Sequence, residues 1–454
     1  MQEAVLTCFN GRSISHSICV FPIPCANTHT HTHPPLCTHS AGSILTLRRL
    51  LIMAGGINFR VIMSPLSAAG ICYRREGSVR NIMDHICRRH HGTNSRRDAG
   101  TDSSSLRTFP KVQLHIHLDG AVRHDTLWRA ARKKGLCGPA NTFHEFVDLV
   151  RCSKGDLVSF LSSFDTILPI IAGDRELISQ IAYELCEDQA NEGVVYFEAR
   201  YCPHYMSSSF STPSSRKNSV VKDDYLTPRD VVMAVNDGMR RGCRQFNVKG
   251  RTLLCLIRPC PEFSHEMVEL SHEFLNDTVV GIDMAGDEDA PCTKEHIDAF
   301  KLAADLGLHR TVHAGELGPA ENVRFAVEEL GAERIGHGYQ IYQDLDVYKM
   351  IRDRFVHLEL CPTSSIYTGA CKGRLSDHIA KRFEKDGFNI GINTDDPTLL
   401  SNTMESEFEL AKRYFDFNDG QLKNMTMNAA RASFLPESEK THLIQELQTK
   451  FDAL

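Results

Sequence analysis

Short β-rich runs alternate with segments of helical character from Pro110 nearly to the C-terminus, and this pattern constrains the fold more than any other feature. Eight of the runs have the composition of strands. Strands separated by helices pair in parallel through right-handed crossovers, and the closed form of that α/β pattern is a (β/α)8 barrel. A doubly wound open sheet is the alternative. The predicted strands are residues 112–117, 194–200, 252–257, 279–284, 310–313, 334–337, 355–360 and 388–393.

Two of the intervening segments also carry signals for the ends of helices. Residues 175–191 have helical character, and Gly193 follows just beyond their end. In residues 227–243, Thr227 can serve as the N-cap and Pro228 as the first helical residue, where its missing N–H is no loss. Helices therefore fill at least these two of the crossovers that a barrel requires.

Residues 1–105 differ in character from the rest of the chain. They contain a Thr-His alternation at residues 28–33, a Pro pair, and clusters of Ser and Arg without a sustained helical or strand period. We expect a low-complexity, disordered extension there and one barrel domain over residues 106–454. A metal-binding histidine tract, an Arg-rich transit peptide, a gene-model artefact and a rare isoform are alternatives for the extension.

The distribution of charge argues against one class of partner. The formal net charge is −6; residues 1–105 hold eleven Arg, no Lys and five acidic residues, so they carry +6 and the remainder carries −12. An acidic body lacks the basic face that the phosphates of a nucleic acid require. We therefore expect a small-molecule substrate and no nucleic-acid partner.

Cysteine usage and hydropathy bear on the compartment. The 16 cysteines are scattered along the chain and form no CxxC pair, which is typical of reduced thiols in a cytosolic protein. No apolar run approaches the roughly 20 residues needed to span a bilayer. We expect a soluble, cytoplasmic protein without an integral membrane segment.

The first predicted strand ends in the sequence LHIHLDG, residues 114–120. Side chains two positions apart on a strand point to the same face, so His115 and His117 both face the barrel mouth and can reach one metal ion. A pair of hydrogen-bonded surface histidines is the alternative for so short a pattern. Further ligands are needed to decide between the two.

Three later strands end in groups that suit the same site. The fifth leads into His313 and Glu316, the sixth ends at His337, and the eighth leads into Asp395 and Asp396. Barrel enzymes place their chemistry at the carboxyl ends of the strands, where all these groups lie. Taken singly, each histidine could be a packed structural side chain, and the two aspartates could cap a helix that begins at the following proline. Their coincidence at equivalent barrel positions favours a catalytic site.

Three imidazoles and one carboxylate leave a zinc ion with an open position for water, which distinguishes a catalytic site from a closed structural one. Such an ion lowers the pKa of water toward neutrality. Burial would raise the pKa of Glu316 and keep it protonated as a general acid. His337 would orient the water and help to take its proton. The expected zinc ligands are His115, His117, His313 and Asp395.

Five motifs extend this interpretation to a family. The stretches PKVQLHIHLDGA, MAGDE, HAGE, GHGY and NTDDP occur in this order and resemble those of the adenosine deaminase branch of the metal-dependent amidohydrolases. The likeness covers about three quarters of the chain, from Pro110 nearly to the C-terminus. It implies a TIM barrel of the metal-dependent hydrolase type, one Zn²⁺ per chain, and a monomer. The implied reaction is deamination of adenosine and 2′-deoxyadenosine to inosine and 2′-deoxyinosine, with release of ammonia, in purine salvage.

The resemblance also implies how the purine is held. Glu316 would donate a proton to N1, Asp396 would bind N7, and the backbone of Gly286 would meet N3. His337 would lie beside the attacking water. Because these protein groups contact three nitrogens of the purine ring, they would reject a pyrimidine.

The residue at position 119 bears on the branch of the family. Asp119 and His117 would contact the ribose 5′-hydroxyl. Relatives that act on free adenine tend to have Glu at the position of Asp119, and relatives that act on N6-methylated AMP tend to have Asn. A carboxylate there would also repel a 5′-phosphate, so the resemblance favours the nucleoside.

Residues 157–164 resemble the apolar lid of the family. Leu157, Phe160 and Phe164 are the side chains concerned. Closing such a lid would exclude water and strengthen the electrostatics of the site. The same spacing fits the apolar face of an ordinary helix equally well.

Two other classes of function remain to be weighed. A barrel that serves only as a cell-surface binding protein would be expected to lose the acid or a ligand, and this chain keeps all of them. A cell-surface protein partner beside catalysis stays open. Deamination of structured RNA is disfavoured by the acidic body and by the absence of an H-x-E pattern with P-C-x-x-C.

Overall fold

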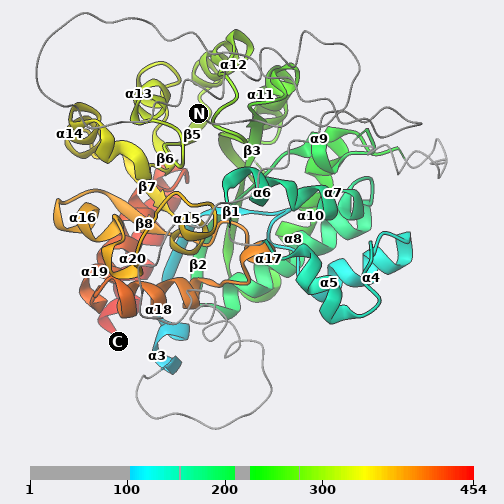
Figure 1. Ribbon diagram of the computed structural model, residues 1–454, viewed down its shortest axis with the longest axis horizontal. Coiled ribbons are helices and arrows are strands. Elements are labelled where there is room, and N and C mark those ends of the chain that lie inside the picture. Colours follow the sequence, from blue (N-terminus) through cyan, green and yellow to red (C-terminus); the bar gives the residue numbers. More distant parts are fainter. Residues whose placement is uncertain (1–102, 153–154, 210–224, 276) are drawn as a thin grey trace, which may run out of the picture. The chain divides into compact units, whose positions relative to one another are not determined.

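The computed structural model describes residues 103–152, 155–209, 225–275 and 277–454, all of which belong to one compact unit. Eight strands form a single parallel sheet in the order in which they occur along the chain (Figure 1). They are β1 (Lys111–His117), β2 (Val194–Tyr201), β3 (Lys249–Ile257), β4 (Val279–Ala285), β5 (His309–Ala314), β6 (Arg334–His337), β7 (His357–Leu360) and β8 (Ile390–Ile392).

The sheet closes on itself through β1 and the segment that follows β8. The backbone N–H of His117 donates to the carbonyl of Asp395 (2.9 Å), and the N–H of Asp395 donates to the carbonyl of His115 (3.1 Å). The predicted (β/α)8 barrel is confirmed. The open doubly wound sheet is wrong, because the strand order runs from β1 to β8 without the reversal that such a sheet requires.

Helices connect successive strands and surround the barrel (Figure 1). The segment between β1 and β2 carries α4 to α8. The α-helices are α3 (Ser103–Thr108), α4 (His124–Lys134), α5 (Phe143–Val150), α6 (Leu157–Ser162), α7 (Phe164–Ile171), α8 (Arg175–Asn191), α9 (Pro203–Met206), α10 (Pro228–Phe246), α11 (Ser264–Glu273), α12 (Lys294–Asp305), α13 (Ala320–Glu328), α14 (Leu345–Asp353), α15 (Pro362–Tyr367), α16 (Ala380–Lys385), α17 (Pro397–Leu400), α18 (Met404–Tyr414), α19 (Asp419–Ala432) and α20 (Glu437–Asp452). Within the described residues there are three short 3-10 helices, η3 (Pro261–Phe263), η4 (Tyr339–Gln343) and η5 (Leu375–Asp377).

Local sequence explains where α10 begins and how closely it packs. The side chain of Thr227 accepts the N–H of Asp230, whose carboxylate accepts the N–H of Thr227 in return, so the predicted cap at Thr227 is confirmed. On the face toward α8, a Cβ at Gly238 would lie 2.1 Å from the carbonyl of Ser179. Only glycine permits the two helices to approach so closely.

Two predicted strands are too long: residues 355–360 exceed β7 at the start, and residues 388–393 exceed β8 at both ends. The β7 prediction began at Phe355, but this residue has a left-handed backbone (φ +53°) and starts no ladder. The β8 prediction ran to Asn393, whose side-chain oxygen instead accepts the N–H groups of Leu114 and His115. In both cases a tertiary or turn constraint overrides the local strand pattern.

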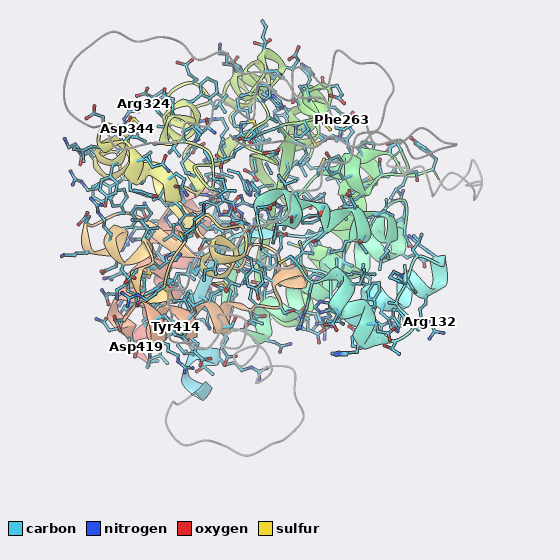
Figure 2. All side chains as sticks on the ribbon, viewed as in Figure 1. Arg132, Phe263, Arg324, Asp344, Tyr414 and Asp419 are labelled. Atoms are coloured by element: carbon cyan, nitrogen blue, oxygen red, sulfur yellow. The ribbon has the colours of Figure 1, made fainter. Side chains whose placement is uncertain are left out.

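Figure 2 shows Arg324 and Asp344 close together at the edge of the view. Arg324 on α13 and Asp344 before α14 approach to 3.5 Å, an exposed pairing of the kind that contributes little to stability. None of the helices in the described ranges is long and apolar enough to cross a bilayer. The extension predicted for residues 1–105 lies outside the described residues apart from the start of α3 and stays a prediction.

Candidate active site

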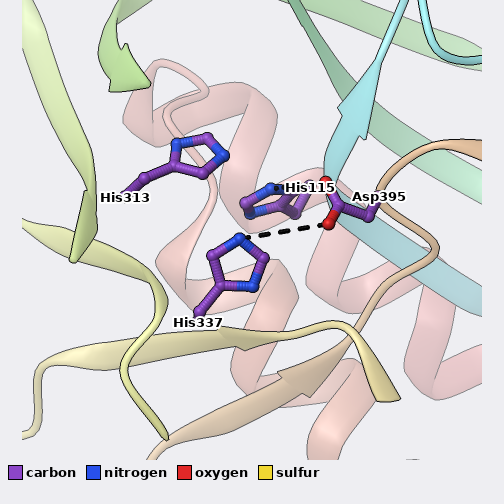
Figure 3. A group of neighbouring side chains, drawn as sticks. All are labelled: His115, His313, His337 and Asp395. Carbon is purple, nitrogen blue, oxygen red and sulfur yellow. Dashed lines mark ion pairs between the residues drawn. The ribbon is translucent and has the colours of Figure 1, made fainter. Parts of the chain in front are cut away.

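The side chains singled out by the sequence converge on one end of the barrel. His115 and His117 come from the end of β1, His313 from β5, His337 from β6, and Asp395 from the turn after β8. Figure 3 shows three of the imidazoles and the carboxylate pointing toward a common centre. Because parallel strands share one carboxyl edge, residues up to 280 positions apart in the chain come together here.

The distances between these groups fit a zinc ion. The carboxylate Oδ1 of Asp395 lies 3.2 Å from Nε2 of His115 and 3.4 Å from Nε2 of His117. The Nε2 atoms of His117 and His313 lie 3.2 Å apart. Ligands at zinc distances around a tetrahedral ion are separated by about 3.3 Å. The arrangement therefore has the size of such a site.

His337 belongs to the same cluster. One ligand atom each of His115, His313, His337 and Asp395 lies within 4.8 Å of the others, and His117, Asp395 and Asp396 form a second such group. Nε2 of His337 lies 4.0 Å from Oδ2 of Asp395 and 3.7 Å from Oε2 of Glu316. His337 thus stands between the ligand cluster and the carboxyl group of Glu316.

Two of these residues have an unusual backbone. His337 (φ +69°) and Asp395 (φ +68°) are both in the left-handed region, which non-glycine residues rarely adopt. The hydrogen bonds of Asp395 with β1 hold its turn, and the N–H of Gly338, which donates to the carbonyl of Ala314 (3.0 Å), holds that of His337. Such backbone persists only where the surrounding structure imposes it, and functional sites are where it gathers.

A layer of buried charges beneath the cluster orients two of the imidazoles. Nδ1 of His115 lies 2.8 Å from the carboxylate of Glu359, and Nδ1 of His313 lies 3.0 Å from that of Asp283. Arg200 donates to both carboxylates, at 2.7 and 3.2 Å. With each Nδ1 engaged, Nε2 of each ring is directed to the centre. The sequence analysis missed these three residues, although charged residues within otherwise apolar strand runs were a usable signal.

The acidic groups of the site divide into two kinds. Burial, aided by the nearby charges of Asp395 and Glu288, raises the pKa of Glu316 well above its usual range. Burial and the charge of Asp395 likewise raise the pKa of Asp396. For Asp395 itself, burial is outweighed by the attraction of His115 and its neighbours, so the pKa falls well below the usual value. Neighbouring carboxyl groups in this site therefore have pKa values shifted in opposite directions.

A cavity of about 310 Å³ opens above the cluster. Burial raises the pKa of Asp119 on its wall to about 6. Among the described residues, no group donates to or accepts from Oδ1 of Asp119 or Oδ1 of Asp396, although both atoms are buried. Both oxygens are therefore available to a polar group that enters the cavity. All the predicted site residues except the deeply buried His115 line this cavity: His117, Asp119, Leu157, Phe160, Phe164, Gly286, His313, Glu316, His337, Asp395 and Asp396.

The apolar wall of the cavity comes from two short helices. Leu157 and Phe160 on α6 are buried against it, whereas Val158 between them is 65% exposed. The carboxylate of Asp156 caps α6 by accepting the N–H of Ser159 (2.8 Å). Gly286 lines the opposite wall with φ +99°, a backbone that favours glycine. The predicted apolar residues thus do face the site.

A parallel barrel with a His/Asp cluster at the carboxyl ends of its strands defines the metal-dependent amidohydrolases as the class of this protein. The family model "Adenosine deaminase" matches residues 110–450. The chain belongs to the adenosine deaminase family, whose members are hydrolytic deaminases. The predicted family is confirmed.

Individual relatives agree with this assignment. Adenosine deaminase of Xenopus tropicalis is 44% identical, with 74% of this chain and 94% of the relative covered. Adenosine deaminase of Mus musculus is 40% identical, with 75% and 97% covered. An amidohydrolase from Burkhoderia ambifaria, solved with bound zinc, superposes with a TM-score of 0.68 at 25% sequence identity. The match covers 79% of this chain and 94% of that protein. An N6-mAMP deaminase of Arabidopsis reaches 0.66 at 25% identity, covering 77% and all of the other chain.

Proposed function

We propose that this protein converts adenosine and 2′-deoxyadenosine to inosine and 2′-deoxyinosine in a zinc-dependent hydrolysis that releases ammonia. One observation carries the proposal: a zinc-sized His/Asp cluster and two carboxyl groups of raised pKa, Glu316 and Asp396, share one cavity. The likeness to adenosine deaminases over three quarters of the chain supports adenosine as the substrate.

The residues present suit one zinc ion per chain. Zinc binds imidazole nitrogen and carboxylate oxygen atoms, and the distances between these atoms here match a tetrahedral arrangement. When bound, zinc would supply a Lewis acid that makes water nucleophilic at neutral pH. The proposed ligands are His115, His117, His313 and Asp395.

Glu316 and His337 divide the proton transfers between them. The raised pKa of Glu316 favours its protonated form, which can donate to N1 of the purine. Protonation at N1 makes C6 open to attack by water. Burial lowers the pKa of His337 well below its usual range, so its neutral ring can accept a proton from that water. As the tetrahedral centre at C6 collapses, the proton taken by His337 passes to the amine, which leaves as ammonia, and the C6 hydroxyl proton returns to Glu316.

The remaining polar groups select the substrate. N7 of a purine is only an acceptor, and the raised pKa of Asp396 keeps a proton on its carboxyl group to donate. The backbone of Gly286 would meet N3. Asp119 and His117 would contact the ribose 5′-hydroxyl, and the partnerless Oδ1 of Asp119 is suited to accept it. Leu157, Phe160 and Phe164 would cover the base.

Deamination of N6-methyl-AMP is the second candidate, favoured by the structural likeness to the Arabidopsis enzyme. The carboxylate of Asp119 speaks against it, because a 5′-phosphate would meet a like charge in a buried place. Free adenine would leave Asp119 without a partner. We therefore rank the nucleoside first.

Parallel assays of the purified full chain with zinc test the proposal. Adenosine, 2′-deoxyadenosine, AMP, N6-methyl-AMP and adenine would be compared by ammonia release, with metal content measured on the same sample. We expect turnover of the two nucleosides and one zinc per chain. Turnover of N6-methyl-AMP alone would move the protein to the other branch, and no turnover with zinc bound would favour a binding protein.

We further propose that residues 106–454 are sufficient for this activity and that the enzyme is a cytoplasmic monomer. The ten cysteines that the structure describes are all free, as a reducing compartment favours. A truncated chain that lacks residues 1–105 should match the full chain in kcat and KM. Sedimentation of both would report their oligomeric state.

A further inference from the structure

The loop that carries Glu316 leaves the sheet where β5 ends, at Ala314. Its backbone groups therefore lose their strand partners and must bond elsewhere, because buried N–H and C=O groups are seldom left unpaired. We call residues 315–318 the acid loop. Side chains, rather than another strand, satisfy much of its backbone.

One buried carboxylate accepts three of the N–H groups of the acid loop. Oε1 of Glu288 accepts the N–H of Gly315 (2.6 Å). Oε2 accepts the N–H groups of Leu317 (2.9 Å) and Gly318 (2.8 Å). These donors stand on both sides of Glu316, so Glu288 grips the turn on which the proposed proton donor sits. Hydrogen bonds from N–H groups to an ionised carboxylate are among the stronger ones.

Gln340 holds the carbonyl groups of the same loop. Its backbone N–H donates to the carbonyl of Gly315 (2.8 Å). Its side-chain Nε2 donates to the carbonyls of Glu316 and Ala370, both at 2.9 Å. Glu288 binds the donors of the loop and Gln340 its acceptors, which restrains the backbone of Glu316 from two directions.

The fit between the acid loop and Glu288 leaves no spare room. A Cβ at Gly318 would lie 2.8 Å from Oε1 of Glu288, and Gly315 has a left-handed backbone (φ +66°). Glu288 is 8% exposed and lies three residues after β4. It does not line the cavity that the proposed substrate would occupy. Its hydrogen bonds toward the site all go to the acid loop.

We propose that Glu288 is a positioning residue for the reaction, whose carboxylate fixes the acid loop so that the carboxyl group of Glu316 is aimed at the purine N1. This inference rests on the proposed role of Glu316 as proton donor. Displacement of a reacting group by about 1 Å costs on the order of 100-fold in rate. The same carboxylate adds a negative charge near Glu316, which helps to keep that side chain protonated.

A double-mutant cycle separates positioning from mere support of the fold. The variants are Glu288→Gln, Glu316→Gln and the double variant, each assayed for kcat, KM and zinc content. Gln keeps the size of Glu288 but presents an NH₂ group to N–H donors. We expect Glu288→Gln to lower kcat about 10- to 100-fold, with KM and zinc content close to wild type. In the Glu316→Gln background the same substitution should change kcat little, because no proton donor remains to be aimed.

Glu192→Gln is the matched control. Glu192 precedes β2 at the opposite end of the barrel, and its carboxylate also accepts a backbone N–H, from Met404 (2.6 Å). This control should leave kcat unchanged. Should Glu288→Gln not fold, Glu288→Asp, which keeps the charge but shortens the reach, is held to the same expectation.

Two results would overturn the inference. One is a wild-type kcat in the folded variant at position 288. The other is an equal fall in kcat with and without Glu316, which would mean that Glu288 acts on something else. An active Glu316→Gln enzyme would instead refute the proposed proton donor, so the two failures are distinguishable.

Discussion

The floor of the cavity and its apolar wall are built in opposite ways. The floor groups His313, His337 and Asp395 leave strand ends or the turns next to them, and buried hydrogen bonds fix them. The wall groups Leu157 and Phe160 sit on α6, a helix of six residues with one capping side chain. The floor cannot rearrange without disturbing the barrel, whereas the wall can.

This difference separates two tasks. Transfer of protons and charge needs groups held within a fraction of an ångström, which the barrel supplies. Substrate entry needs a part of the cavity wall that can open at a small cost in free energy. Short helices with few contacts suit this role. We therefore expect substitutions in the floor to abolish catalysis and substitutions in the wall to weaken binding.

Loss of a floor imidazole should have the largest effect. His313→Ala removes a proposed zinc ligand, and since loss of a residue that merely supports a ligand costs about 10- to 100-fold in metal affinity, loss of the ligand itself should cost more. The zinc content and the rate of ammonia release should both fall to background. His309→Ala, on the same strand but outside the cavity, is the control and should keep both. If the His313→Ala variant retained zinc, His313 would not be a ligand and the floor would not hold the metal as proposed.

Tyr339 packs against both His337 of the floor and the buried His378, and His378 should make the fold sensitive to acid. Nδ1 of His378 accepts the N–H of Ala380 (3.1 Å), so Nε2 carries the proton and lies 2.9 Å from the hydroxyl of Ser365 on α15. Burial lowers the pKa of His378 to about 3. Above pH about 6.5 the ring is neutral in both folded and unfolded chains; below it only the unfolded chain gains the proton.

The free energy of unfolding should therefore fall by about 1.4 kcal/mol per pH unit through this residue as the pH drops from 6.5 toward 3. Urea unfolding at several pH values would measure the slope. His378→Gln should flatten it, while His144→Gln, at a side chain that is 87% exposed, should not. An unchanged slope in His378→Gln would contradict the assignment.

Truncation of the wall should weaken binding and spare the chemistry. Phe160→Ala removes about 1.5 kcal/mol of apolar contact, so KM should rise roughly tenfold with kcat within about twofold of wild type. Steady-state kinetics with adenosine would show the split. The matched variant is Val158→Ala, on the same helix but facing solvent. A fall in kcat equal to that of a floor variant would show that the wall takes part in catalysis.

The smallest effect should come from the cap of α6. Asp156→Ala removes one capping hydrogen bond at an exposed helix end, so KM should rise by about five-fold at most. Amide hydrogen exchange of residues 159–162 should quicken in the same variant. Thr142→Ala, which removes the cap of α5, is the control. Faster exchange without any change in KM would separate the stability of α6 from substrate binding.

Much of the floor could be predicted from the sequence because it follows strand geometry. His115 and His117 share a face by the two-residue period of a strand, and the shared carboxyl edge of parallel strands brings His313 and Asp395 to them. These rules depend only on the order of strands and on where each one ends. The predicted positions accordingly lie together in the structure.

Features set by tertiary contacts escaped the sequence. No local pattern marks the left-handed backbone of His337, or pairs Glu288 with a loop about 30 residues away. The link from Arg200 through Glu359 to His115 joins β2 and β1 to β7, which lies far from both in the chain. The role of the wall residues could not be decided from the sequence, because an apolar stripe on a helix looks the same whether it faces a core or a ligand.

The left-handed backbone of His337 and Asp395 has a consequence for evolution. Glycine accepts this conformation without steric cost, so selection for stability alone favours replacing both side chains. A duplicated gene freed from its chemical duty should drift toward glycine at these two codons. A histidine and an aspartate at these positions are therefore disfavoured by the backbone, and it is their chemistry that accounts for them.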